Sequence, residues 1–94
     1  MAYVSDFTSD NVGNPDRYTV VTSCRRITVQ EKDRTAVTLA KFNVYPRIGD
    51  SGYKQFLGGE TFTYDPGYVL QPKTQIFALE TVGVASTVFS IVEE

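Results

Sequence analysis

The sequence predicts an all-β domain, either a small antiparallel β-sandwich or a small barrel. Strand-length runs are rich in β-branched and aromatic residues, as in Thr-Phe-Thr-Tyr at 61–64 and Thr-Val-Phe-Ser-Ile-Val at 87–92. Seven Gly and four Pro break these runs. No segment repeats apolar residues at the spacings of three and four that helices require. The chain has room for roughly six to eight short strands.

The first seventeen residues differ from the rest of the 94-residue chain, because they are polar and rich in turn formers. We therefore expect an extended N-terminal arm over residues 1–17 and one β-sandwich domain over residues 18–94. Tyr3 and Phe7 are apolar groups within this polar segment and could anchor the arm on a neighbouring subunit. A frayed terminus explains the same composition.

The first strands of the domain are predicted at residues 18–21 and 24–30, where Ile27 and Val29 share one face. The charged segment 31–34 is expected to form a hairpin turn into the longest strand, residues 35–45. The apolar residues of this strand change faces near Lys41, because Val37 and Leu39 are odd-numbered and Phe42 and Val44 are even-numbered. This change indicates a β-bulge or a strand buried on both faces toward its end. Residues 46–55, with a turn cluster at 49–52, are expected to form either a surface loop between two sheets or a contact loop.

The last third of the chain alternates strands and turns. Strands are predicted at 60–64, 68–70, 74–80 and 86–92, with Asp65 setting the turn before Pro66 and Gly67. Residues 81–85 are expected to close a hairpin between the last two strands. The predicted core follows from the strand faces: Ile27, Val29, Val37, Leu39, Phe62, Ile76 or Phe77, and Phe89 or Ile91.

Composition argues against several functional classes. The net charge is −2, and Arg25-Arg26 is the only adjacent basic pair, so we expect no nucleic-acid partner. No apolar run reaches the roughly 18 residues of a membrane span, and the N-terminus lacks a secretory signal pattern. We therefore expect a soluble protein, made in a cytoplasm, without membrane association. Cys24 is the single cysteine, which excludes an intrachain disulfide.

The sequence offers no catalytic constellation. Histidine is absent, which removes the commonest general base and metal ligand. Cys24 lies in a predicted strand and is expected to be a small buried apolar residue. Asp65 and Glu80 could pair across strands, but no spacing indicates it. Residues 6–11 carry too few oxygen ligands for a calcium loop. We expect no catalytic, metal or cofactor site, and therefore a protein that is not an enzyme.

Tyrosines gather in the middle of the chain near Pro46, Pro66 and Pro72. Exposed Tyr beside Pro and Gly loops is typical of protein contact surfaces and of sugar stacking, whereas strand Tyr is often half-buried. The candidate partner contacts are Tyr3, Phe7, Tyr45, Tyr53 and Tyr68. A carbohydrate-binding module would use the last three as a stacking platform, although the absence of Trp counts against it.

The order of these segments resembles small structural proteins of tailed-bacteriophage virions. The shared features are the early strand at 24–29, the Thr/Val-rich strand, a "G-G-E-T-F" entry at 58–62, "G-Y-V-L-Q-P-K-T" at 67–74, and a final strand at 86–92. The resemblance implies a β-sandwich that serves as a capsid decoration (cement) protein, or as a tail or fibre component. It implies a homo-oligomer, preferably a trimer, bound to a major capsid or tail protein. The location would then be the virion, after synthesis in the host cytoplasm.

Overall fold

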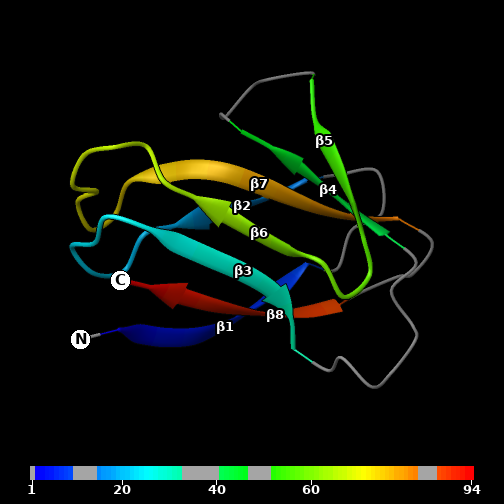
Figure 1. Ribbon diagram of the computed structural model, residues 1–94, viewed down its shortest axis with the longest axis horizontal. Coiled ribbons are helices and arrows are strands. Elements are labelled where there is room, and N and C mark those ends of the chain that lie inside the picture. Colours follow the sequence, from blue (N-terminus) through cyan, green and yellow to red (C-terminus); the bar gives the residue numbers. More distant parts are fainter. Residues whose placement is uncertain (1, 10–14, 33–40, 47–51, 83–86) are drawn as a thin grey trace.

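The computed structural model describes residues 2–9, 15–32, 41–46, 52–82 and 87–94. These residues form eight strands and no helix (Figure 1). The strands are β1 (Tyr3–Ser9), β2 (Asp16–Thr19), β3 (Ile27–Glu31), β4 (Lys41–Tyr45), β5 (Lys54–Leu57), β6 (Thr61–Tyr64), β7 (Gln75–Val82) and β8 (Thr87–Glu93). The all-β prediction is confirmed.

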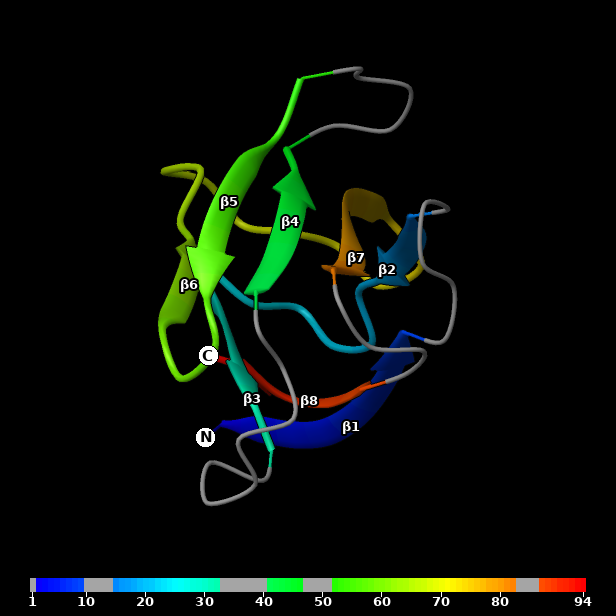
Figure 2. The same ribbon diagram turned by 90° about the vertical axis from the view of Figure 1, so that its right-hand side faces the viewer.

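The strands form two four-stranded antiparallel sheets that pack face to face. We call the sheet with the order β1-β8-β3-β6 sheet A, and the sheet with the order β2-β7-β4-β5 sheet B. Figure 2 shows them as two layers, with β1, β8 and β3 below β2, β7 and β4. The architecture is therefore a sandwich rather than a barrel.

The strand order has a simple origin in the pairing. Strand β1 pairs with β8, β2 with β7, β3 with β6, and β4 with β5. The first half of the chain therefore pairs antiparallel with the second half, strand by strand. The pairs enter the two sheets in turn: β1–β8 and β3–β6 lie in sheet A, and β2–β7 and β4–β5 lie in sheet B. The pairs β3–β8 and β4–β7 then complete the sheets. An eight-stranded sandwich with this double Greek-key connection is a jelly roll.

The N-terminal segment is part of this sandwich, which corrects the expectation of a separate arm over residues 1–17. Strand β1 pairs with β8 over its full length, from Tyr3 opposite Glu93 to Ser9 opposite Thr87. Strand β2 begins at Asp16 and pairs with β7. The polar composition was interpreted as an arm, but β1 is an edge strand, and the outer face of an edge strand can remain polar.

Both predicted hairpins are wrong. Strand β3 belongs to sheet A and β4 to sheet B, so these two strands do not form a hairpin. Strands β7 and β8 also lie in different sheets, although the sequence predicted a hairpin between them through residues 81–85. Strand alternation specifies a buried face but not the sheet that supplies its cover, so a crossover and a hairpin have the same local pattern.

The core lies between the sheets and is rich in aromatic contacts. Phe42 of β4 meets Phe89 of β8 edge to face, with 5.2 Å between ring centroids. Phe62 of β6 likewise meets Phe56 of β5 and Phe77 of β7. Such pairs join sheet A to sheet B at several points and contribute roughly 0.5–1.5 kcal/mol each beyond area burial.

The predicted core is largely confirmed. Ile27, Val29 and both members of each ambiguous pair (Ile76 and Phe77, Phe89 and Ile91) are buried. Phe62 is half-buried and packs on this core. In β4, Phe42, Asn43 and Val44 are all buried, as expected for a strand covered on both faces. Val37 and Leu39 lie outside the described residues, and from Lys41 onward the register of β4 with β5 and β7 shows no bulge.

Candidate functional site

A pocket of about 340 Å³ lies at one end of sheet A. The antiparallel register creates it, because Ile27 stands opposite both Tyr64 and Glu93. The start of β3, the end of β6 and the end of β8 therefore meet at one edge. The residues that line the pocket are the neighbours of these strand ends: Arg25, Arg26, Asp65, Gly67 and Glu94.

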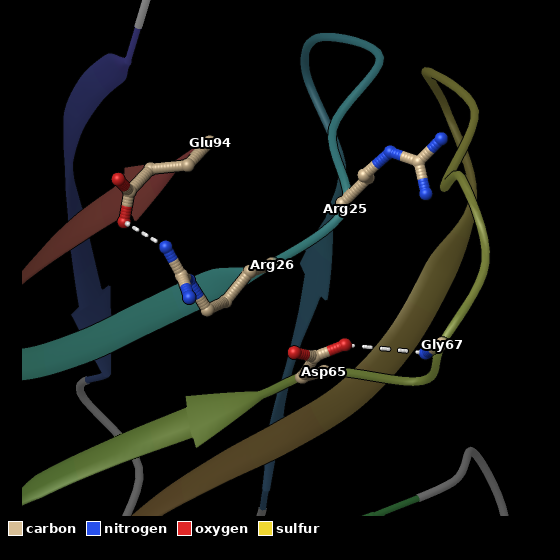
Figure 3. Close-up of a pocket in the computed structure, with 5 residues that line it drawn as sticks. All are labelled: Arg25, Arg26, Asp65, Gly67 and Glu94. Carbon is tan, nitrogen blue, oxygen red and sulfur yellow. Dashed lines mark hydrogen bonds and ion pairs between the residues drawn. The ribbon is translucent and has the colours of Figure 1, made fainter.

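The charged side chains of this pocket are partly paired with one another (Figure 3). Arg26 Nη2 lies 3.6 Å from Glu94 Oε1, and both side chains are about half exposed. Asp65 Oδ1 accepts a hydrogen bond of 3.2 Å from the Gly67 amide, which confirms its expected role in the turn. Arg25 points in a different direction from Arg26, and no ion pair within the described part of the chain reaches its guanidinium.

The charges of this lining balance. Two guanidinium groups and two side-chain carboxylates line the pocket, and one pair of them, Arg26 and Glu94, is already engaged in an ion pair. Within the described ranges, no group of three or more His, Cys, Asp or Glu is arranged to hold a metal ion.

A second candidate site lies on the outer face of sheet B. The rings of Tyr45 and Tyr53 approach to 5.4 Å between centroids at the end of the β4–β5 hairpin. Next to them, Gln55 Nε2 donates to Asn43 Oδ1 (3.0 Å), and Asn43 Nδ2 donates to Glu80 Oε1 (2.9 Å). We call this cluster of Tyr45, Tyr53, Asn43, Gln55 and Glu80 the tyrosine–amide face.

Hydrogen bonding makes the tyrosine–amide face rigid. The Tyr45 hydroxyl donates to Glu80 Oε1 at 2.9 Å, so one carboxylate oxygen fixes both Tyr45 and Asn43. Burial raises the pKa of Tyr45, and the hydrogen bond to Glu80 and the charge of that carboxylate raise it further. Tyr53 remains 53% exposed and Gln55 is exposed as well. The face therefore combines an accessible ring with an accessible amide.

The structure separates the other candidate contacts from this face. Tyr68 is 59% exposed and interacts with Tyr64, beyond the end of β6 in sheet A. It is therefore not part of one platform with Tyr45 and Tyr53. Tyr3 is exposed on β1. Phe7 is half-buried and packs against Tyr18 of its own chain, at 5.7 Å between ring centroids.

Glu93 is a buried carboxylate that the sequence analysis missed. It is 1% exposed and accepts hydrogen bonds from the Tyr18 hydroxyl, the Val21 and Thr22 amides, and the Thr22 hydroxyl. Burial alone would raise the pKa of Glu93, but these hydrogen bonds together lower it below its ordinary value. Strand alternation in the sequence could have identified it, because Glu93 lies on the same strand face as Phe89 and Ile91.

Cys24 is buried, as predicted, and forms an isolated bridge with Leu70. Burial raises the pKa of its thiol, and the negative charge of Glu93 adds to the increase. The thiolate is the nucleophilic form of cysteine, so these surroundings make Cys24 unreactive. Asp65 and Glu80, considered above as a pair, have separate partners: the Gly67 amide for the first, and Asn43 and Tyr45 for the second.

Comparison of the chain with protein-family models, with curated proteins and with solved structures finds no match. None of the described ranges contains a helix that is long and apolar enough to cross a membrane.

Proposed function

We propose that this protein is a non-enzymatic structural component of a tailed-phage virion, a capsid decoration protein that assembles with copies of itself on the particle. The observation that carries the proposal is the jelly-roll strand order, β1-β8-β3-β6 over β2-β7-β4-β5. Virus capsid domains are among the proteins built on this order. The argument is one of fold analogy, and it agrees with the virion resemblance of the sequence.

The distribution of exposed apolar side chains supports an assembly role. Among the residues that the structure describes, the two most exposed large apolar side chains are Leu57, at 63%, and Val4, at 62%. Leu57 lies on β5, an edge strand of sheet B, and Val4 on β1, an edge strand of sheet A. These strands lie on opposite sides of the molecule in both views (Figures 1 and 2). One molecule can therefore contact two neighbours at once, as a building block of a larger assembly must.

Native mass spectrometry and light scattering of the full chain, over a wide range of concentrations, test this proposal. A closed oligomer supports it and directs the next experiment to binding of purified capsids or tails. Those two particles distinguish a decoration protein from the alternative, a tail or fibre component. A monomer at every concentration would contradict the assembly role.

The tyrosine–amide face favours a second function, carbohydrate binding. Tyrosine rings stack on sugar faces, amides bind sugar hydroxyls, and lectin domains also use the jelly-roll order. The chain has six Tyr and no Trp, so tyrosine fluorescence can follow a titration with chitohexaose, cellohexaose or maltohexaose. We expect Tyr53→Ala to abolish such binding and Tyr68→Ala, a control of similar exposure outside the face, to preserve it. Absence of a response to all three sugars would exclude these ligands.

A further inference from the structure

Strand β1 presents a long open edge. It spans seven residues and pairs with β8 in an unbroken register, from Tyr3 opposite Glu93 to Ser9 opposite Thr87. No other strand in the described part of the chain pairs with its second edge. The backbone N–H and C=O groups along such an edge can pair with another strand.

The three other edge strands are short. Strand β6 has four residues and is followed by Asp65 and Pro66, while β5 has four residues and begins at Lys54. Strand β2 also has four residues, and its register breaks between Arg17 and Thr19. Short length, charged residues, proline and irregular register are the devices that keep sheet edges from pairing. Each of these edges therefore has at least one such device.

Strand β1 lacks those devices. Its sequence, Tyr-Val-Ser-Asp-Phe-Thr-Ser, contains no Lys, Arg, Pro or Gly. Asp6 is its only charge, and its Oδ2 lies 2.6 Å from Lys32 Nζ in an ion pair that reaches across the intervening strand β8. The charge is therefore partly neutralised by its own sheet. Tyr3 and Val4 are exposed on β1 and would lose water contact if a strand were added.

We propose that β1 pairs antiparallel with β1 of a second copy, so that the two A sheets form one continuous eight-stranded sheet. This inference rests on the self-assembly proposed above and identifies the surface that carries it. A second copy is the favoured occupant because it offers an edge of equal length and equal regularity. A four-residue edge such as β6 would leave part of β1 uncovered.

The residues of β1 select a register for this pairing. Centring the two-fold axis on Ser5 places Tyr3 of each copy opposite Phe7 of the other, on the inner face that Phe7 shares with Tyr18. Aromatic cross-strand pairs stabilise antiparallel sheets. Centring the axis on Asp6 would instead oppose two carboxylates, which is unfavourable. The Ser5-centred register is therefore preferred.

Such pairing is isologous, so it produces dimers or assemblies with an even number of copies. That result differs from the trimer that the virion resemblance implies. A closed trimer would require β1 to meet a different surface of the next copy. An odd number of copies would therefore exclude β1–β1 pairing as the interface, and slower exchange of the β1 amides on assembly distinguishes this pairing from an even-numbered head-to-tail ring.

The test compares Val4→Glu with Val88→Glu by native mass spectrometry of the full chain. In the Ser5-centred register Val4 lies opposite Asp6 of the other copy, so Val4→Glu would oppose two carboxylates. Val4 and Val88 lie on the same outer face of sheet A, but β1 is an edge strand and β8 is an internal one. Both side chains are exposed, so both variants should fold, which circular dichroism verifies. We expect wild-type protein and Val88→Glu to form dimers or larger even-numbered assemblies, and Val4→Glu to be monomeric.

Hydrogen exchange of the wild-type backbone amides gives a second measurement, independent of any variant. If β1 pairs with β1, amides of residues 3–9 should exchange more slowly as concentration rises, while those of β6 should not change. Assembly that survives Val4→Glu without added β1 protection would overturn the edge proposal and leave self-assembly standing. A trimer would overturn the two-fold pairing. A wild-type monomer at all concentrations would overturn both this inference and the assembly function.

Discussion

The Tyr18 hydroxyl donates a hydrogen bond to the Glu93 carboxylate, and this contact joins β2 of sheet B to β8 of sheet A. The two residues are 75 positions apart. Glu93 Oε2 also accepts from the Val21 amide at 2.9 Å, and Oε1 accepts from the Thr22 amide at 2.7 Å. The carboxylate thus holds the chain just after β2 against the end of β8.

Replacing this carboxylate should destabilise the sandwich strongly. Glu93→Ala leaves the Tyr18 hydroxyl and the amides of Val21 and Thr22 without their acceptor, and loses of the order of 3–5 kcal/mol. The neighbouring Glu94 forms only a half-exposed ion pair with Arg26, so Glu94→Ala should change stability by less than about 1 kcal/mol. Urea unfolding of both variants measures the difference. Equal effects would mean that Glu93 is not the anchor described here.

Acid should weaken the fold through the same group. The pKa of Glu93 is lower in the folded protein than its ordinary value of about 4.3, so the unfolded state binds more protons in the window below that value. The stabilisation is complete above this pH and is lost as the pH falls toward the folded pKa. Unfolding free energies measured below about pH 5 should therefore fall more steeply for the wild type than for Glu93→Gln. Parallel pH profiles would contradict the assignment.

Alkali should weaken the fold through Tyr18. Burial raises the pKa of its hydroxyl, and the hydrogen bond to Glu93 and the charge of that carboxylate raise it further. The folded protein then keeps a proton that the unfolded chain releases above about pH 10. Stability is therefore lost as the pH rises beyond that value. Tyr18→Phe should be less stable at neutral pH, but its free energy of unfolding should fall less steeply with rising pH than that of the wild type. Some alkaline loss of stability should remain in this variant, because the pKa values of Tyr45 and Tyr64 are also raised. Unfolding free energies measured across the alkaline range for both proteins check this.

The buried faces of β3 and β8 could be predicted from the sequence because burial alternates along these two strands. Ile27 and Val29 in β3, and Phe89 and Ile91 in β8, are buried on the inner face as their alternation indicates. The same alternation places Glu93 inside. We did not expect Glu93 in the core because it is charged, and a carboxylate is buried only where hydrogen bonds compensate for the loss of its contacts with water. Its donor on Tyr18 comes from the opposite sheet, and its donors on Val21 and Thr22 come from the segment just after β2.

Strand partners could not be predicted in the same way. The ribbon pairing joins β1 to β8 and β2 to β7, across most of the chain, and nothing local to any of these strands specifies the partner. The N-terminal strand was therefore mistaken for an arm. The tyrosine–amide face depends on this pairing as well, because Glu80 of β7 reaches Asn43 of β4 only through the sheet register.

The contact between Phe42 and Phe89 should be one of the most sensitive points of the core. Both rings are fully buried, and each comes from a different sheet. Phe89→Ala would leave a cavity and should lower the unfolding free energy by about 3–5 kcal/mol. Val88, the preceding residue, is 38% exposed, so Val88→Ala should change it by roughly 0.5 kcal/mol. A change of similarly small size for Phe89→Ala would remove Phe89 from the core.

Lys73 is a site where a glycine should stabilise the fold. Its φ of 72° lies in the left-handed region, and its amide is held by a 2.7 Å hydrogen bond to the Val20 carbonyl. The backbone of a residue with a side chain is strained in this region, and glycine relieves that strain. Glycine also has more freedom in the unfolded chain, which offsets part of the gain, so Lys73→Gly should raise the free energy of unfolding by about 0.5–1 kcal/mol. Gly67 provides the reciprocal control: its φ is 86° and nothing crowds an added Cβ, so Gly67→Ala should lose about 1 kcal/mol through the backbone alone. Thermal unfolding of the two variants should therefore shift in opposite directions, and a shift of both in the same direction would contradict the strain at residue 73.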